Sequence, residues 1–430
     1  MVTGSVGMAV KYVNEDQYEE IGMANIAILG YGTVGSGVYE VIRKNQAIVN
    51  KNAGEAVEIK HVLDLRDFPG DPVEEILTHD FNDILNDKDV SVVVEVMGGV
   101  EPAYTFVKGC LEAGKSVCTS NKALVAAKGP ELIRIARQKG INFFFEASVG
   151  GGIPIIRVLN LCLTADDIEE ISGILNGTTN YMMTKMADEG WEFEEALKTA
   201  QDLGYAERNP EADIDGWDAC RKIAILTSLY TGKNTDYERV YTEGITKISA
   251  RDIKYAKELG FKIKLIAESQ KTDDGLVAMV APIMLKRSHP LYNVDDVLNA
   301  VYVRGNVLGP AMFFGSGAGK LPTASAVVSD VIAAVKNKTN VRVDWDDKDL
   351  ELCSVGSVKR SFFVRVSGSE EEKLDRIKEL FGEVDIVKAP GVTGETGFVT
   401  GVMTEEEFEK GFKQLEGAIT RIRVDNREDK

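Results

Sequence analysis

The stretch of sequence that decides the fold is NIAILGYGTVGSGV, residues 25–38. It begins with an apolar run, Asn25–Leu29, and passes through glycines into Thr33–Lys44, where apolar residues recur at helical spacing. A short apolar run that ends in glycines is typical of a buried strand followed by a tight turn. The stretch therefore predicts a strand, a turn and a helix in immediate succession.

The glycines of the turn follow the pattern G-x-G-x-x-G, at Gly30, Gly32 and Gly35. In this context the first two glycines permit the tight turn and the close approach of a pyrophosphate, and the third lets helix and strand pack closely. The free N–H groups at the start of the helix, around Thr33 and Val34, suit phosphate oxygens. We expect a dinucleotide-binding turn; the alternative is a glycine-rich turn that binds nothing.

The acidic residue that usually contacts the cofactor ribose is displaced along this chain. The candidate, Asp64, follows a predicted strand over Glu58–Leu65 and comes after an insertion, Asn45–Glu58. Asp64 favours NAD because a carboxylate accepts a hydrogen bond from the ribose 2′-hydroxyl. Arg66 favours NADP because a guanidinium pairs with a 2′-phosphate. The choice between NAD and NADP stays open at this stage.

Strand and helix patterns alternate over the whole of residues 24–150, which we expect to form the dinucleotide-binding domain. The run Val90–Met97 is almost entirely apolar and β-branched, as in a strand buried on both faces. Further elements are predicted at Pro102–Ala113, Ser116–Thr119, after Asn121 and at Ile141–Phe145. The fold class is therefore α/β, with an N-terminal Rossmann-type, doubly wound parallel sheet.

After residue 150 the predicted helices and strands no longer alternate regularly. Residues 151–340 mix helices and strands and are expected to form an α+β catalytic and dimerisation domain. An acidic connection, 341–350, leads to residues 355–430, where strand and helix patterns follow the order βαββαβ of the ferredoxin-like group. Three domains also agree with a length of 430 residues at roughly 150 residues per domain.

Composition excludes several classes of protein. The formal net charge of −18 argues against nucleic acid or an anionic membrane as a partner, because both reward a basic surface. Only three histidines are present, so a multi-histidine metal site is not expected. Five scattered cysteines without a C-x-x-C pair indicate a reducing cytoplasm. No run is long and apolar enough for a membrane helix, and residues 1–23 suggest no function.

An acidic segment, residues 204–218, leads into a predicted helix over Asp218–Tyr230. Asp215 is the expected N-cap of that helix. Asp218 and Lys222 are i,i+4 neighbours, and a surface ion pair of this kind contributes only about 0.3–0.5 kcal/mol. Lys222, however, shares its face with apolar residues, and a lysine on a buried stripe must be paired or neutral. The alternatives are a surface ion pair and a proton-transfer group.

Two loops that follow predicted strands carry further candidates. Lys122 stands just past Ser116–Thr119, at the carboxyl end of a parallel strand, where ligands bind. Its alternative is an ordinary surface lysine. The segment Glu146–Pro154 contains three successive glycines that free backbone carbonyls, and with a carboxylate nearby this suits a hard cation. Its alternative is an interdomain hinge.

Taken together, these segments resemble the homoserine dehydrogenase family over about residues 24–335. The matching motifs are Gly30–Gly35, Met97–Gly99, Thr119–Lys122, Glu146–Pro154, Asn176–Tyr181, Gly204–Lys222 and Gly317–Val327. The resemblance implies a reversible, NAD- or NADP-dependent interconversion of L-homoserine and L-aspartate 4-semialdehyde, within the biosynthesis of threonine, methionine and isoleucine. It also implies a homodimer or a higher homo-oligomer formed through the middle domain.

The resemblance assigns roles residue by residue. It places the catalytic lysine at Lys222 and a second functional lysine, which also serves the cofactor, at Lys122. The other implied positions are substrate-binding or lysine-orienting acids at Glu207, Asp213 and Asp218, pocket residues at Thr178 and Tyr205, and a sodium site at the Glu146 side chain with backbone oxygens of Val149, Gly151 and Ile153.

The C-terminal βαββαβ segment resembles the ACT domains, which bind amino-acid effectors, and this implies threonine or another amino acid as an effector. The usual acidic-x-x-Pro-Gly turn is replaced here by Gly368-Ser369-Glu370-Glu371, so dimerisation is the alternative role. Two other functions compete with the family activity. They are another Rossmann oxidoreductase acting on an amino-acid semialdehyde, and a non-catalytic nucleotide or amino-acid sensor.

Overall fold

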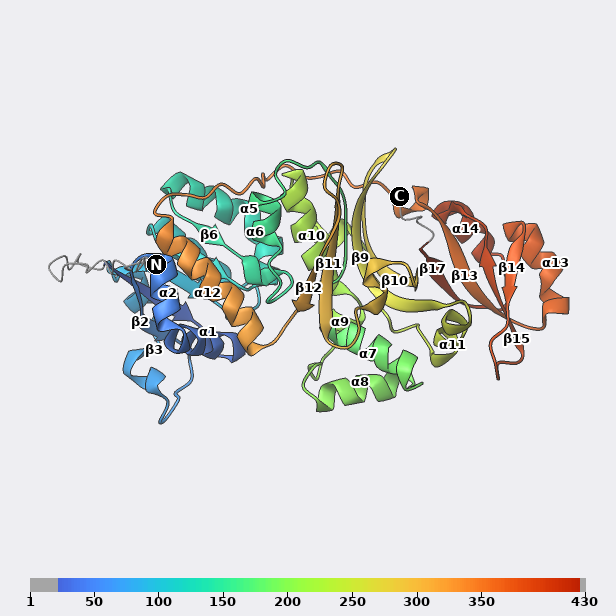
Figure 1. Cartoon of the computed structure of the whole chain (residues 1–430), viewed down its shortest axis with the longest axis horizontal. Helices are drawn as coiled ribbons and strands as arrows, with labels where there is room; N and C mark the ends of the chain where they lie inside the picture. Colours follow the sequence, from blue (N-terminus) through green and yellow to red (C-terminus); the bar gives the residue numbers. More distant parts are fainter. Residues whose placement is uncertain (1–21, 426–430) are drawn as a thin grey trace, which may run out of the picture.

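A computed structural model describes residues 22–425 of the chain. The described residues form three regions that follow one another along the long axis of the molecule (Figure 1). The predicted N-terminal extension falls almost entirely on residues 1–21, which lie outside the described residues. No helix of the described part is long and apolar enough to cross a membrane.

The N-terminal region contains a six-stranded sheet in the order β3-β2-β1-β4-β5-β6. All of its pairings are parallel. The strands are β1 (Met23–Leu29), β2 (Ala56–Leu63), β3 (Leu77–Thr78), β4 (Val90–Glu95), β5 (Ser116–Thr119) and β6 (Phe143–Phe144). The bounds of β1, β2, β4, β5 and β6 differ from the predicted ones by a few residues at most, whereas the short β3 was not predicted. The predicted Rossmann-type sheet is confirmed.

Helices cover both faces of this sheet, and one of them comes from far along the chain. Helices α1 (Thr33–Lys44), α2 (Gln46–Ala53) and α12 (Lys320–Lys336) share one hydrophobic core with the sheet. Helices α4 (Ala103–Glu112) and α5 (Lys122–Lys139) pack on the other face. Figure 1 shows α12, in orange, lying beside the blue α1 and α2. The predicted insertion before β2 is thus largely the helix α2.

The middle region is organised around a mixed sheet of eleven strands. Its main path is β12-β11-β7-β9-β10-β17-β13-β15-β14, with two short strands attached. The strands of the middle region are β7 (Ile168–Ile174), β8 (Tyr241–Thr242), β9 (Phe261–Thr272), β10 (Gly275–Lys286), β11 (Leu298–Gly305) and β12 (Gly309–Ser316). Its helices include α6 (Ile156–Leu161), α7 (Gly177–Asp188), α8 (Phe193–Asp202), α9 (Glu211–Ile214), α10 (Trp217–Thr231) and α11 (Ala250–Glu258).

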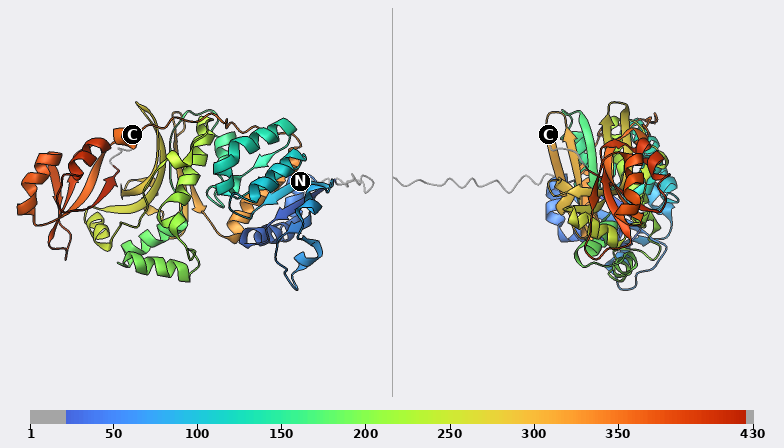
Figure 2. Two further views of the ribbon diagram at one scale, coloured as in Figure 1. Left: turned by 180° about the vertical axis from the view of Figure 1, so that it is seen from behind. Right: turned by 90° about the vertical axis from the view of Figure 1, so that its right-hand side faces the viewer.

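The C-terminal region has the predicted order βαββαβ. It consists of β13 (Lys359–Ser367), α13 (Glu370–Phe381), β14 (Val384–Val387), β15 (Glu395–Thr400), α14 (Glu405–Phe412) and β17 (Ala418–Val424), with a short β16 (Met403–Thr404) before α14. Its last strand, β17, pairs in parallel with β10 through Ile283 and Met284. The C-terminal strands therefore extend the sheet of the middle region, at the opposite end of the molecule from the dinucleotide-type sheet (Figure 2).

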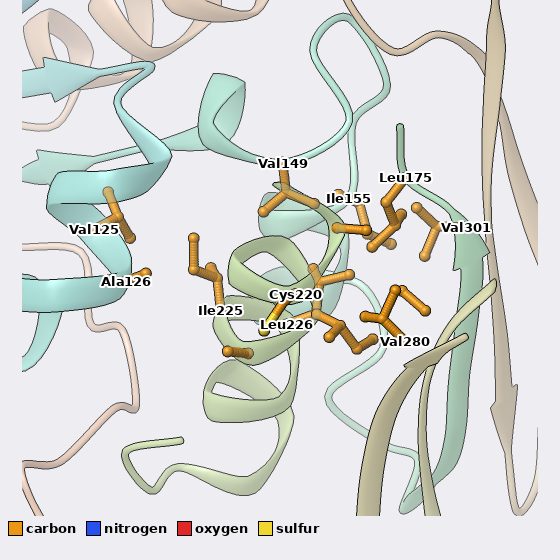
Figure 3. Close-up of a cluster of buried hydrophobic side chains, with 14 of the residues drawn as sticks. Val125, Ala126, Val149, Ile155, Leu175, Cys220, Ile225, Leu226, Val280 and Val301 are labelled. Atoms are coloured by element: carbon orange, nitrogen blue, oxygen red, sulfur yellow. The ribbon is translucent and has the colours of Figure 1, made fainter. Parts of the chain in front are cut away.

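Helix α10 lies between the N-terminal region and the large sheet. Figure 3 shows Ile225 on the side of α5, near Val125 and Ala126, and Leu226 on the side of Val280 in β10. All these side chains are buried. Burying apolar side chains on both sides stabilises the helix by roughly 1.5–3 kcal/mol for each large one, so α10 holds a fixed place between two domains.

The start of α10 differs from the prediction. The N-cap is Gly216 and not Asp215, which instead ends the short helix α9. Gly216 has a φ of +87°, a left-handed conformation that disfavours other residues. A Cβ at this position would also lie 3.1 Å from Cγ2 of Thr242 and 3.3 Å from Cγ1 of Val280. Sterics at the turn therefore decide where the helix begins.

Candidate active site

The candidate site is centred on one buried carboxylate, that of Asp218 in the first turn of α10. Its Oδ2 lies 2.7 Å from Nζ of Lys222 and accepts a hydrogen bond of 2.9 Å from Nδ2 of Asn176. Its Oδ1 lies 2.6 Å from Nζ of Lys122. Burial raises the pKa of Asp218, but the two ammonium groups outweigh it and hold this pKa well below its usual range. Asp218 is therefore an anion that joins two lysines.

Lys222 is buried, as the apolar stripe on its helix predicted, with only 8% of its surface exposed. Its ammonium donates to the backbone oxygen of Leu175 at 2.6 Å and to Asp218. Burial lowers the pKa of Lys222, while the Asp218 carboxylate opposes that shift. A surface ion pair is thus the wrong description of this contact. A lysine whose pKa is depressed inside a protein is suited to proton transfer.

Lys122 reaches the same carboxylate from the other domain. It is the first residue of α5, whose N-cap Asn121 accepts a hydrogen bond of 3.1 Å from the N–H of Leu124. Asp218 raises the pKa of Lys122, so this ammonium stays charged. The ion pair between Lys122 and Asp218 therefore crosses from the dinucleotide-type domain to α10.

Asn176 joins the two acids of the site. Its Nδ2 donates to Oδ1 of Asp213 at 2.7 Å as well as to Asp218. Its Oδ1 accepts from the N–H of Thr179 at 2.8 Å and so caps α7. Burial raises the pKa of Asp213, and Asp218 adds to the rise. The sequence analysis placed Asn176 in a family motif but did not assign it to the site; the local pattern, an asparagine before Gly177, indicates only an N-cap.

The remaining predicted substrate residues form the outer part of the site. Thr178 Oγ1 donates to the backbone oxygen of Tyr205 at 2.6 Å, which connects α7 to the loop after α8. Tyr205 and Glu207 are exposed. Among residues 22–425 the Glu207 side chain has no hydrogen bond or ion pair. Asp213, Asp218, Lys122, Lys222 and Thr178 are thus brought together, whereas Glu207 stands at the open edge.

The glycine turn opens onto a cavity of about 550 Å³ at the carboxyl ends of β1 and β4. The sheet order reverses between these two strands, which is where ligands bind in doubly wound folds. Gly30 has a φ of +97°, and a Cβ at Gly35 would lie 1.9 Å from the Gly30 oxygen. No atom lies within 4 Å of a Cβ at Gly32. The turn is therefore closely packed at Gly30 and Gly35 and faces open space at Gly32.

Asp64 and Arg66 line this cavity together. The Asp64 carboxylate accepts from Nε and Nη2 of Arg66, both at 2.9 Å, from the Arg66 N–H at 3.0 Å and from the Tyr31 N–H at 2.8 Å. The bonds from Arg66 hold the pKa of Asp64 well below its usual range. The two residues that favour different cofactors are therefore paired with each other.

Glu95, at the carboxyl end of β4, is another residue that the sequence analysis did not predict to belong to the site. It is completely buried, and burial raises its pKa. It accepts hydrogen bonds from the Met97 N–H at 2.8 Å, Thr119 Oγ1 at 2.6 Å and Asn121 Nδ2 at 3.4 Å. Glu95 thereby ties the loop after β4 to the loop that presents Lys122. The available signal was one acid in an otherwise apolar strand.

The segment Glu146–Pro154 connects β6 to α6. The Glu146 carboxylate accepts three backbone N–H groups, from Ile155, Ile156 and Arg157, at 2.7–2.9 Å. Within the described residues, no donor is bonded to the backbone oxygens of Val149, Gly151 and Ile153. No cluster of three or more His, Cys, Asp and Glu residues suited to a metal occurs there either. A cation at this segment would thus depend mainly on carbonyl oxygens.

These features define a class of protein. A parallel dinucleotide-type sheet carries an open G-x-G-x-x-G turn, and a buried carboxylate with two lysines connects that domain to the next. Such a combination is typical of a nicotinamide-dependent oxidoreductase.

Comparison with known proteins specifies the family. Residues 30–146 match the family model for the homoserine dehydrogenase NAD binding domain, and residues 154–332 match the homoserine dehydrogenase model. The homoserine dehydrogenase of Bacillus subtilis is 45% identical over 316 residues, 73% of either chain. That of Synechocystis is 41% identical over 414 residues, 94% of this chain and 93% of the relative. The chain belongs to the homoserine dehydrogenase family, and its activity is that of an NAD(P)-dependent oxidoreductase.

Solved structures agree with this assignment. The homoserine dehydrogenase from Thiobacillus denitrificans has a TM-score of 0.87 at 33% identity, covering 94% of this chain and 98% of that one. The S. aureus enzyme at pH 6.5 has a TM-score of 0.78 at 33% identity, covering 94% and 99%. A hyperthermophilic archaeal homoserine dehydrogenase mutant in complex with NADPH has a TM-score of 0.64 at 30% identity, covering 75% and 100%. Of the three functions considered, the family activity is therefore the one supported.

Proposed function

We propose that Lys222 is the proton-transfer group in the interconversion of L-homoserine and L-aspartate 4-semialdehyde. The observation that carries the proposal is the cluster in which the buried Asp218 and Lys222 meet Lys122 of the dinucleotide-type domain. The nicotinamide cofactor, when bound, supplies or accepts the hydride. Lys222 donates a proton to the carbonyl oxygen during reduction and takes one from the hydroxyl during oxidation.

Asp218 and Lys122 prepare Lys222 for this task. Asp218 fixes the direction of the Lys222 side chain through the 2.7 Å contact. Its charge also opposes the fall in the pKa of Lys222 that burial causes. Lys122 remains cationic and comes from the domain that binds the cofactor, so its charge favours an alkoxide developing between the two domains. The three groups act as one unit.

The substrate's ammonium group requires acids, and the site provides them. Asp213 is held by Asn176 next to Asp218, and Glu207 stands at the open edge. Thr178 and Tyr205 line the wall between α7 and the loop after α8. We assign Glu207 and Asp213 to the substrate ammonium, and Thr178 and Tyr205 to the surrounding pocket.

The replacement Lys222→Met tests the central role. It keeps an unbranched side chain of similar length but removes the proton donor, so we expect turnover to fall by a factor of about 10²–10⁴, as for loss of general acid–base catalysis. Binding of NADH and NADPH, followed by fluorescence titration, should change little. A folded variant with near-normal turnover would disprove the assignment.

The cofactor occupies, in this proposal, the cavity above Gly30, Gly32 and Gly35, with its phosphates toward the N–H groups at Thr33 and Val34. Asp64 and Arg66 then decide between NAD and NADP. Arg66 is the more exposed of the pair, with 61% of its side chain accessible, so it can turn outward to a 2′-phosphate. Following the formation of NADH and NADPH from homoserine in parallel assays tests this choice.

The segment after β6 offers some of the oxygen ligands that a monovalent cation requires. The family resemblance implies that this cation is sodium. The backbone oxygens of Val149, Gly151 and Ile153 have no donor among the described residues, which suits a hard cation. Glu146 already accepts three N–H groups, so its carboxylate adds charge and holds the segment in place. The cation would order the connection between the domains and so hold Lys122 against Asp218.

Sodium binding can be measured apart from catalysis. We expect sodium chloride to raise the melting temperature and to broaden the ²³Na NMR signal, with choline chloride at equal ionic strength as the control. The variant Glu146→Gln should weaken both effects, because the amide keeps one acceptor oxygen and loses the charge. Equal melting temperatures in sodium and choline, together with an unbroadened signal, would exclude the site.

The C-terminal unit is assigned as an ACT-like domain that binds threonine or another amino acid. Its strand order β17-β13-β15-β14 supports this assignment. At the first turn Ser369 forms a capping box with Glu372, in place of the usual Pro-Gly turn. Calorimetric titration with threonine and inhibition of turnover by threonine test the effector role. If threonine neither binds nor inhibits, dimerisation is the role that remains for this unit.

A homodimer is the assembly that we propose. The edge strand β12 exposes Met312 and Phe314, and the hairpin before it exposes Val307 and Leu308. Apolar side chains gathered on a sheet edge favour association with a second copy. Sedimentation of the wild type and of Phe314→Lys distinguishes a dimer from a monomer.

All five cysteines are free, which supports a reducing cytoplasm as the site of action.

A further inference from the structure

The last strand of the chain is anchored to the middle region through the carboxylate of Glu243. Strand β17 carries Arg421 and Arg423, whose Nη1 atoms lie 3.0 Å and 2.8 Å from Oε2 of Glu243. Tyr241 donates its hydroxyl to the same oxygen at 3.1 Å. The Arg423 side chain is 1% exposed and that of Arg421 is 17% exposed. The contact is thus a largely buried charge cluster between two domains.

Glu243 belongs to a short segment that also contacts the end of α9, just before α10. The Glu243 N–H donates to the Val280 oxygen at 2.8 Å, and the Ile245 N–H donates to the Ile214 oxygen at 2.8 Å. Between them, Gly244 approaches so closely that a Cβ would lie 2.1 Å from the Ile214 oxygen. The backbone at Ile214 therefore rests directly on the segment that Glu243 anchors.

Both acids of the candidate site lie close to this contact, Asp213 in α9 and Asp218 in the first turn of α10. Asp213 directly precedes Ile214, and Asp218 follows it four positions later. Between them Gly216 packs against Thr242, with 3.1 Å from its hypothetical Cβ to Cγ2. The backbone positions of Asp213 and Asp218 are therefore set by residues 242–245, which Arg421 and Arg423 hold in turn.

We propose that Glu243 is a positioning residue for the dehydrogenase reaction, through which the last strand of the C-terminal unit holds Asp213 and Asp218 in place. The inference rests on the roles proposed above for those two acids. Glu243 contacts neither of them directly. It acts through the backbone contacts at Val280 and Ile214. The C-terminal unit is, on this view, part of the framework of the catalytic site.

The variant Glu243→Gln tests the proposal because the amide keeps the size of the side chain and removes its charge. We expect the KM for homoserine to rise about tenfold, a loss of about 1.4 kcal/mol. The KM for the nicotinamide cofactor should stay within twofold, because the cofactor cavity lies in the other domain. Arg421→Gln should produce the same pattern from within the C-terminal unit.

Glu409→Gln is the matched control. Glu409, on α14, is the other acidic partner of Arg421, at 2.6 Å from its Nε, and within residues 22–425 its side chain forms no hydrogen bond or ion pair with residues 241–245. We expect this variant to keep the wild-type KM for homoserine. If Glu243→Gln fails to fold, Arg421→Gln carries the test, since its side chain is partly exposed.

Three outcomes would overturn the proposal. They are an unchanged homoserine KM in the folded variants, an equal rise in Glu409→Gln, and a fall in kcat with both KM values unchanged, which indicates only a smaller active fraction. None of these bears on Lys222, whose role is decided separately by Lys222→Met. Failure of the positioning role and failure of the proposed catalytic role are therefore distinguishable.

Discussion

Lys122 and Lys222 contact opposite oxygens of one carboxylate. Nζ of Lys122 lies 2.6 Å from Oδ1 of Asp218, and Nζ of Lys222 lies 2.7 Å from its Oδ2. The first lysine starts a helix of the dinucleotide-type domain, and the second stands one turn into α10. One buried anion therefore contacts a lysine from each of the two domains.

Removing that anion should change the pH dependence of the reaction. In Asp218→Asn the pKa of Lys222 should fall further, because burial already lowers it and the carboxylate that opposes the shift is gone. Homoserine oxidation requires neutral Lys222 as the base, so the rise of kcat/KM with pH should move to lower pH. The maximal rate should also fall by a factor of about 10² or more, because Lys222 loses its orientation. Profiles of kcat/KM against pH provide the measurement; a rise at unchanged or higher pH contradicts the role.

Asn176 should contribute to both stability and substrate affinity. Asn176→Ala removes the N-cap of α7, which costs about 0.5–2 kcal/mol, and frees Asp213 and Asp218 from their shared donor. We expect a lower melting temperature and a raised KM for homoserine. Thr404→Ala removes the N-cap of α14, far from the site, and is the control for stability alone. Equal KM values in both variants would limit Asn176 to capping.

Glu95 should act on cofactor affinity. Glu95→Ala leaves the Met97 N–H and the Thr119 hydroxyl without their buried acceptor, which costs about 1–3 kcal/mol for each unsatisfied group. We expect a raised KM for the cofactor and a lower kcat, because the Lys122 loop is bonded to the same carboxylate through Asn121. Glu95→Gln keeps the size of the side chain and one acceptor oxygen for the Met97 N–H, so it should restore most of the activity. Failure of the glutamine to restore activity would show that the charge is required.

Arg66 should discriminate between the two cofactors. In Arg66→Ala the pairing with a 2′-phosphate is lost, so the KM for NADP should rise about tenfold, while the KM for NAD should change less than twofold. Asp64 is simultaneously freed to accept a ribose hydroxyl. Arg43→Ala, at an exposed arginine of α1 outside the cavity, serves as the control. An equal change for both cofactors would exclude selectivity at this position.

The parts of the protein that could be predicted from the sequence depend on local spacing. The turn Gly30–Gly35 and its flanking strand and helix are contiguous, and the i,i+4 separation of Asp218 and Lys222 places them on one face of any helix. The apolar stripe around Lys222 indicated its burial, because an amphipathic pattern shows which face is covered. The βαββαβ order at the C-terminus likewise follows from successive local patterns.

The tertiary structure decided what depends on distant segments. The return of α12 to the first sheet, the bond from Asn176 to Asp213 and Asp218, and the burial of Glu95 between two loops follow from packing between elements far apart in the chain. The sequence determined which chemical groups the protein has and which neighbours on a helix or turn share a face. Only folding determined that Lys122 and Lys222 share the carboxylate of Asp218, because side chains 100 positions apart are brought to it by the packing of α10 between two domains and by no local pattern.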